Sequence, residues 1–136
     1  QQSPVADARW ALDEVRRQHG AVPIVLVGHS MGGRTALHVA DDPSVVGVCA
    51  LAPWIERADS ADRLAGKALL VVHGGNDRTT SPRRSAGFAR AAEQAGASVE
   101  YVRVVGGHAM LVRAGRWHRL ATNFTLRTLD AALTPS

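Results

Sequence analysis

The pentapeptide GHSMG at residues 28–32 lies between two segments of different periodicity. Residues 24–27 before it are a short run of branched apolar side chains, which predicts a buried strand. The segment after it predicts a helix over residues 32–40. The order strand, G-x-S-x-G, helix is typical of a sharp turn that holds a serine hydroxyl clear of a sheet. The sequence therefore predicts a nucleophile elbow with Ser30 at its tip.

The two glycines of this pentapeptide have a predicted steric role. The backbone passes close to itself around an elbow serine, so the residues two before and two after must be small. Gly28 and Gly32 occupy those positions. Glycine also adopts unusual backbone dihedral angles without side-chain strain. We therefore expect both positions to require a small residue.

An acidic residue and a histidine follow Ser30, each directly after a further predicted strand. Asp77 comes after the apolar run 68–73, and His108 comes after the run 99–105. The carboxyl ends of parallel strands open on one edge of a sheet, where ligands bind. We expect the three side chains to meet there. Ser30 is then the candidate nucleophile, His108 the general base, and Asp77 the group that orients the imidazole.

Other assignments of these roles remain open. Asp77 ends a glycine-rich segment that is well suited to a turn, so it could serve the backbone only. Glu56 and Asp59, after the preceding strand, are alternative acids. His118 is a rival base, although it lies inside a predicted helix rather than at a strand end. His73 ends a strand and fits a packing or turn-bonding role.

Three segments carry a resemblance to the α/β-hydrolase superfamily: GHSMGG at 28–33, HGGND at 73–77 with Ser81-Pro82 behind it, and GGH at 106–108. The order serine, acid, histidine along the chain is the order of that superfamily. The sequence is most similar to the compact, lidless esterases and dienelactone-hydrolase-like branches. This resemblance implies an enzyme of the carboxylic-ester hydrolase class, which cleaves small-molecule esters or thioesters through an acyl-serine intermediate.

The resemblance also implies how substrate would be held. The backbone N–H of Met31, the residue after the nucleophile, is expected to supply one donor of the oxyanion hole. His29, Trp54 and Met110 are the candidate substrate-binding side chains. The connection over residues 52–67 is too short for a cap domain, which predicts an open site and small or surface-accessible acyl groups.

Alternating strand and helix patterns predict an α/β fold with a parallel sheet, built as three α/β/α layers in a single domain over residues 1–136. The expected helices cover residues 4–19, 32–40, 81–96 and 117–133, with a short one near 61–64. The expected strands cover residues 24–27, 45–51, 68–73 and 99–105.

Four strands correspond to the C-terminal half of an α/β-hydrolase sheet, and the N-terminal strands of the family are missing. The strand before Ser30 is then left with an unpaired edge, which is a site for pairing with another chain. We expect a fragment of a longer hydrolase or a chain completed by a partner. An alternative function follows: a catalytically silent, truncated module that serves in binding.

Composition and charge distribution argue against several other classes of protein. The net charge is +4 with a pI near 10.5, but the arginines are spread along the chain and not interleaved with aromatics, which argues against nucleic-acid binding. No apolar run approaches the roughly 20 residues of a membrane span. Without a signal-peptide pattern at residues 1–4 we expect a cytoplasmic location, and without an initiating methionine a start further upstream.

Metal and cofactor chemistry are not expected either. The chain has no H-E-x-x-H pattern, no G-x-G-x-x-G pattern and no phosphate-binding loop, so we predict neither a metal nor a nucleotide. The single cysteine, Cys49, lies in an apolar predicted strand and is expected to be a small core residue.

Overall fold

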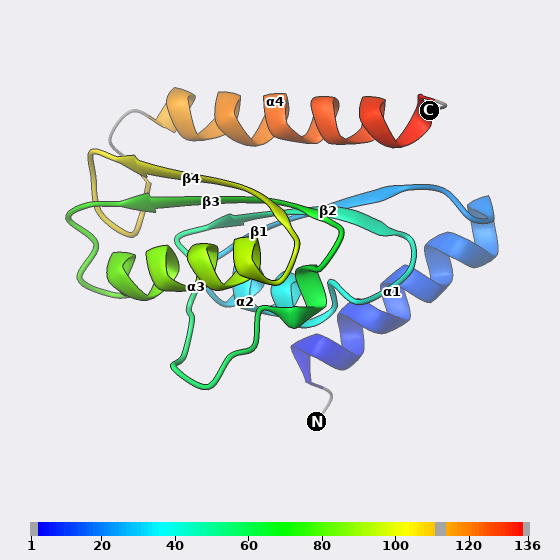
Figure 1. The fold of residues 1–136 in the computed structure, drawn as a ribbon, viewed down its shortest axis with the longest axis horizontal. Helices are drawn as coiled ribbons and strands as arrows, with labels where there is room; N and C mark the ends of the chain where they lie inside the picture. Colours follow the sequence, from blue (N-terminus) through cyan, green and yellow to red (C-terminus); the bar gives the residue numbers. More distant parts are fainter. Residues whose placement is uncertain (1–2, 111–113, 135–136) are drawn as a thin grey trace.

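The computed structural model describes residues 3–110 and 114–134. Its elements alternate as the hydrophobic patterns predict (Figure 1). In chain order they are α1 (Pro4–His19), β1 (Ile24–His29), α2 (Met31–His38), β2 (Val45–Leu51), the 3₁₀ turn η1 (Asp62–Leu64), β3 (Ala68–Gly74), α3 (Pro82–Gln94), β4 (Ser98–Val104) and α4 (Ala114–Leu133).

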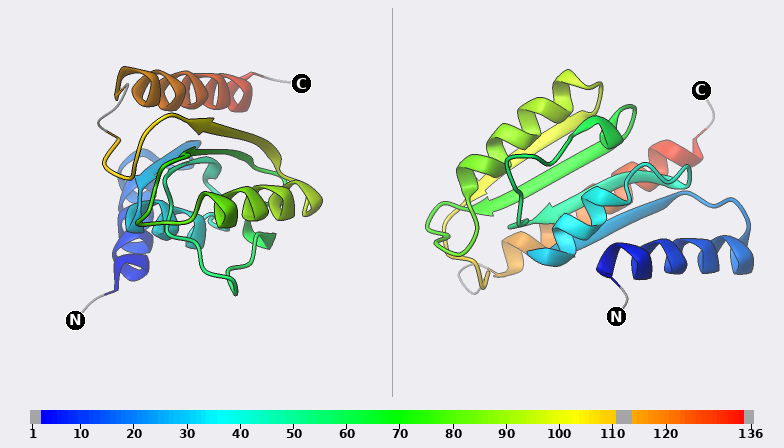
Figure 2. Two further views of the ribbon diagram at one scale, coloured as in Figure 1. Left: turned by 90° about the vertical axis from the view of Figure 1, so that its left-hand side faces the viewer. Right: turned by 90° about the horizontal axis from the view of Figure 1, so that it is seen from below.

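The strands form one parallel sheet in the order β1-β2-β3-β4. Helices α1, α2 and α3 cover one face of this sheet, and α4 covers the other (Figures 1 and 2). The predicted three-layer α/β/α architecture is therefore confirmed. Every strand runs in the same direction, so the turns that follow β1, β3 and β4 all open on one edge of the sheet, where the candidate residues lie.

Two apolar clusters hold the layers together. Residues of β2 and β3 that face α2 and α3 form the larger cluster, with Phe88 and Leu37 as helical members. On the opposite face, Trp117 and Phe124 of α4 pack against Leu70 and Cys49. Burial raises the pKa of the Cys49 thiol to about 12, so this residue is an inert core side chain, as the sequence indicates.

The element bounds differ from the predicted ones mainly around Ser30. Strand β1 continues to His29 and α2 already begins at Met31, so a single residue joins strand to helix. Helix α2 ends at His38, two residues earlier than expected. Helix α4 begins at Ala114 rather than Trp117. The direct junction at Ser30 is what makes the elbow sharp.

Candidate active site

Ser30 lies at the junction in a strained backbone conformation. Its φ is 58° and its ψ is −118°, in the region that L side chains rarely adopt. Such strain costs about 1–3 kcal/mol and persists only where neighbours enforce it. Here the Ser30 N–H donates to the Leu51 carbonyl at 2.9 Å, and the Ser30 carbonyl accepts from the Trp54 N–H at 3.1 Å. Strand β2 and the segment after it therefore fix the elbow.

The close backbone approach around Ser30 involves one of the two expected glycines and one that was not expected. A Cβ atom at Gly28 would lie under 3.0 Å from the carbonyl oxygen of Gly32, so Gly28 must be glycine as predicted. At Gly32 the expectation is wrong, because an added Cβ would meet no atom within 4 Å. The second tight position is Gly33, whose Cβ would lie 3.1 Å from both Gly28 O and Pro53 Cβ.

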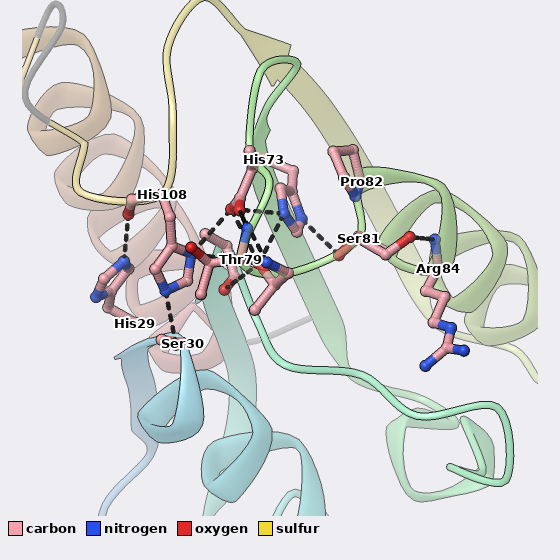
Figure 3. Close-up of polar contacts among 12 residues, drawn as sticks. His29, Ser30, His73, Thr79, Ser81, Pro82, Arg84 and His108 are labelled. Atoms are coloured by element: carbon pink, nitrogen blue, oxygen red, sulfur yellow. Dashed lines mark hydrogen bonds and ion pairs between the residues drawn. The ribbon is translucent and has the colours of Figure 1, made fainter.

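The structure brings Ser30, His108 and Asp77 together in one hydrogen-bonded chain (Figure 3). The Asp77 carboxylate can only accept, so the facing Nδ1 of His108, 2.8 Å from Oδ2, carries the proton. In neutral His108 this leaves Nε2 as the acceptor for the Ser30 hydroxyl, at 2.8 Å. This is the geometry in which an imidazole can take the proton of a serine as the serine attacks.

Asp77 combines the two roles that the sequence left open. Its Oδ1 accepts the backbone N–H groups of Thr79 and Thr80, both at 2.8 Å, and so closes the turn. Its Oδ2 faces His108. Burial acts to raise the pKa of Asp77, but the hydrogen bonds from Thr80 and His108 outweigh it and lower the pKa to about 2. The carboxylate is therefore ionised throughout the neutral range.

Glycines allow the loops that carry Asp77 and His108 to lie against each other. The Gly75 N–H donates to the Val104 carbonyl at 2.8 Å, and the Asn76 N–H donates to the Gly106 carbonyl at 3.1 Å. Gly106 has a φ of 129°, a region open to glycine but not to other residues. These backbone bonds fix the distance between the acid and the histidine.

A second histidine reaches the same carboxylate from the end of β3. His73 is fully buried, with Nε2 3.0 Å from Asp77 Oδ2 and Nδ1 2.7 Å from the Ser85 hydroxyl (Figure 3). The sequence indicated packing or turn bonding for His73. It did not single out Ser85 or Thr80. The HGGND segment places His73 four residues before Asp77, and this spacing is the sequence signal for a contact between the two side chains.

The rival residues lie elsewhere. Asp59 forms a bidentate ion pair with Arg34, at 2.8 and 3.0 Å, and also contacts His38 at 3.2 Å. Glu56 is exposed and lies 3.9 Å from Arg34. His118 is an exposed residue of α4. None of these side chains bonds to His108 or Ser30 in the part of the chain that the structure describes.

Two of the three expected substrate-binding side chains line the same groove. This open, largely apolar groove of about 750 Å³ runs between β1 and α4, with His29 and Met110 in its wall. The Nε2–H of His29 donates to the His108 carbonyl at 2.9 Å. Trp54 instead lines a separate hollow of about 140 Å³ beside Thr80. Met31 is half-exposed at the first position of α2, where backbone N–H groups lack intrahelical acceptors.

Within residues 3–110 and 114–134, no cluster of histidine, cysteine and acidic side chains could hold a metal ion. In the same ranges no helix is both long and apolar enough to cross a membrane.

Comparison with known proteins identifies the fold and the family of this chain. The family model for the alpha/beta hydrolase fold matches residues 3–102. An alpha-beta serine hydrolase homologue from Coxiella burnetii is 24% identical, with a TM-score of 0.69 over 90% of this chain and 57% of its own. A putative alpha/beta hydrolase from Agrobacterium tumefaciens is 19% identical, with a TM-score of 0.80 over 97% of this chain and 63% of its own.

The Bacillus cereus carboxylesterase is 22% identical, with a TM-score of 0.70 over 88% of this chain and 58% of its own. No curated protein matches the sequence. At these identities the solved structures establish the fold alone, and the chain spans less than two thirds of the length of each of these three. With the family model matching most of its residues, the chain belongs to the α/β-hydrolase fold family.

Proposed function

We propose that this chain is a serine hydrolase that cleaves carboxylic esters or thioesters, with Ser30, His108 and Asp77 as its catalytic triad. The observation that carries the proposal is the unbroken path from the Ser30 hydroxyl through both nitrogens of His108 to Asp77, with 2.8 Å at each contact. An isolated serine hydroxyl is a weak nucleophile, and an adjacent oriented base is what activates it.

In the first half-reaction, Ser30 Oγ attacks the carbonyl carbon of the ester while its proton moves to Nε2 of His108. The tetrahedral adduct collapses as His108 returns that proton to the leaving alkoxide or thiolate, and an acyl ester remains on Ser30. In the second half, His108 takes a proton from water as the water oxygen attacks the acyl carbon. His108 then protonates Ser30 Oγ, and the carboxylic acid leaves.

Asp77 supports both halves electrostatically. Its low pKa keeps it charged, so it stabilises the imidazolium that forms on His108 in each step. Its Oδ1 is occupied by backbone N–H groups, so the carboxylate cannot rotate without breaking the turn. The hydrogen bond to Nδ1 also selects the tautomer that leaves Nε2 free to act as base.

The oxyanion of the tetrahedral adduct needs hydrogen-bond donors. The Met31 N–H at the start of α2 is one of them. The usual second donor comes from a loop after the third strand of the family sheet, and no such loop lies among the described residues. Removing one oxyanion donor typically lowers turnover about 10²–10³-fold. We therefore expect formation of the acyl-enzyme to be slow.

The surroundings of Ser30 favour small or surface-accessible acyl groups. The groove beside His29 and Met110 is open rather than enclosed, and the connection from Ala52 to Lys67 holds only a short 3₁₀ turn. A series of p-nitrophenyl esters of increasing chain length tests this expectation. Rates that fall as the acyl chain lengthens support it, and a strong preference for long chains contradicts it.

The decisive experiment for the proposed function is covalent labelling. The purified chain is incubated with a fluorophosphonate probe, and its intact mass is measured beside a Ser30→Ala control. Circular dichroism on both samples shows that they are folded. We expect one adduct on the original chain and none on the control. A folded chain without an adduct contradicts an activated Ser30.

A second candidate, a catalytically silent module that binds a partner, is favoured by one observation. The outer edge of β1 has no partner strand within residues 3–110 and 114–134, and Val27 of this strand is half-exposed. The same labelling experiment separates the two candidates, because the silent module predicts a folded chain that does not react.

A further inference from the structure

A second imidazole, that of His73, contacts Asp77 on its buried side and takes no part in the proton transfers of the proposed reaction. His73 and His108 approach the same oxygen, Oδ2, at 3.0 and 2.8 Å. His108 is partly open to solvent and reaches Ser30 on its other side. His73 is fully buried and reaches the equally buried Ser85 on its other side. The triad is thus continued into the core by two further residues.

The tautomer of His73 follows from these contacts. Burial lowers the pKa of His73 below its usual value despite the neighbouring Asp77, so the ring is neutral and carries one N–H. A proton on Nδ1 would leave the Nε2 lone pair 3.0 Å from an ionised carboxylate oxygen, which is repulsive. A proton on Nε2 gives a hydrogen bond to Asp77, and Nδ1 then accepts the Ser85 hydroxyl at 2.7 Å.

The Thr80 hydroxyl contacts the same carboxylate oxygen as His73 and is compatible with this tautomer. Its hydroxyl lies 2.9 Å from Asp77 Oδ2 and 3.0 Å from His73 Nε2. With the proton of His73 on Nε2, the Thr80 hydroxyl donates to the carboxylate and both groups point hydrogen atoms at Oδ2. The oxygen that faces His108 is therefore held by donors from β3 and from the turn.

We propose that His73 is a positioning residue for the triad: its Nε2–H donates to Asp77 and fixes the carboxylate in the orientation that His108 needs, while the Ser85 hydroxyl holds the imidazole ring in place through Nδ1. This inference rests on the proposed function of Ser30 as the nucleophile. Ser85 lies in the first turn of α3, so the packing of this helix is coupled to the catalytic acid through one hydroxyl. A misplacement of about 1 Å in such a group can lower a rate about 10²-fold.

The test compares two replacements of His73. His73→Leu removes the donor, and His73→Gln places an amide N–H near the position of Nε2. The readout is the fluorophosphonate labelling rate per folded molecule. We expect a loss of about 10–100-fold for His73→Leu, on the scale of such misplacements, and recovery of most of that rate in His73→Gln. Equal rates for both variants and the original chain overturn the proposal.

Ser85→Ala provides an independent measurement if His73→Leu does not fold. It keeps the imidazole but removes the hydroxyl that holds the ring through Nδ1, so we expect an intermediate loss of labelling. The matched control is Ser81→Ala, at the N-cap of the same helix. Ser81 caps α3 by accepting the Arg84 N–H at 3.1 Å, and it is expected to affect stability but not the labelling rate. An unchanged rate in Ser85→Ala contradicts the role of Ser85.

Nitrogen-15 NMR of the histidine rings separates this inference from the proposed function. We expect His73 to be neutral with its proton on Nε2, whether or not Ser30 reacts. A proton on Nδ1 overturns the proposal even if labelling succeeds. If the original chain does not label while His73 has the expected tautomer, the proposed function fails and the hydrogen-bond arrangement stands.

Discussion

A Cβ atom added to Gly74 would lie less than 3.0 Å from the carbonyl oxygen of Gly106. These two glycines sit where β3 and β4 end, so they set how closely the loops carrying Asp77 and His108 can approach. The Gly106 carbonyl also accepts the Asn76 N–H at 3.1 Å. The hydrogen bond between acid and histidine therefore depends on two positions that carry no side chain.

Gly74→Ala is expected to separate these loops and to lower the labelling rate of Ser30 by about 10²-fold, the scale of a 1 Å misplacement in an active site. Gly107→Ala is the matched control, because a Cβ there would meet only Asn76 O, at 4.0 Å. Labelling rates and thermal unfolding of both variants check this prediction. A Gly74→Ala variant that labels at the original rate contradicts the prediction, because the activation of Ser30 would then not depend on how closely the two loops approach.

The low pKa of Asp77 predicts a pH-dependent contribution to stability. Its pKa falls from 3.8 to about 2 on folding, so the carboxylate stabilises the folded state above pH 4 by about 2 kcal/mol. As the pH falls from about 4 toward 2, this contribution is lost. The free energy of unfolding of the original chain and of Asp77→Asn, measured between pH 2 and 6, should converge at the acidic end. A difference independent of pH contradicts the prediction.

Much of the fold was predictable because the local signals agree. Strands β1, β2 and β3 are short, mainly apolar runs, and the ends of α1 at Pro4 and Gly20 match their capping signals. The convergence of Ser30, Asp77 and His108 was predictable for a topological reason. All strands in the sheet are parallel, so residues that follow different strands reach the same edge regardless of their distance in sequence.

The remaining features depend on contacts that no single segment encodes. Ser85 is an ordinary helical serine until the packing of α3 brings it to His73. Trp54 follows β2 at the correct edge, but it lines a hollow that is separate from the groove. At Gly32 the motif implied a steric need that the structure assigns to Gly33, because Pro53 packs against that position. These outcomes depend on tertiary packing rather than on local pattern.

The backbone strain at Ser30 predicts that relieving it raises the stability of the fold. With a φ of 58° and a ψ of −118°, Ser30 adopts a conformation that glycine reaches at lower cost. Ser30→Gly is expected to raise the free energy of unfolding by about 1 kcal/mol, while labelling disappears. Ser30→Ala removes the hydroxyl without relieving the backbone. Denaturant unfolding of the two variants checks this, and equal stability of both contradicts stored strain at the elbow.

The outer edge of β1, which pairs with no strand in the described part of the chain, predicts self-association. The opposite edge strand, β4, carries Glu100 and Arg103, whereas Ile24–Val27 of β1 has no charged side chain, and charged residues are the usual protection of an exposed edge. Val27 is 51% exposed and lines the groove beside this edge. We expect the average mass in light scattering to rise with concentration, and Val27→Lys to shift it toward the monomer. Glu100→Lys, on β4, is the control and should leave the association unchanged. A chain that stays monomeric at every concentration contradicts pairing through β1.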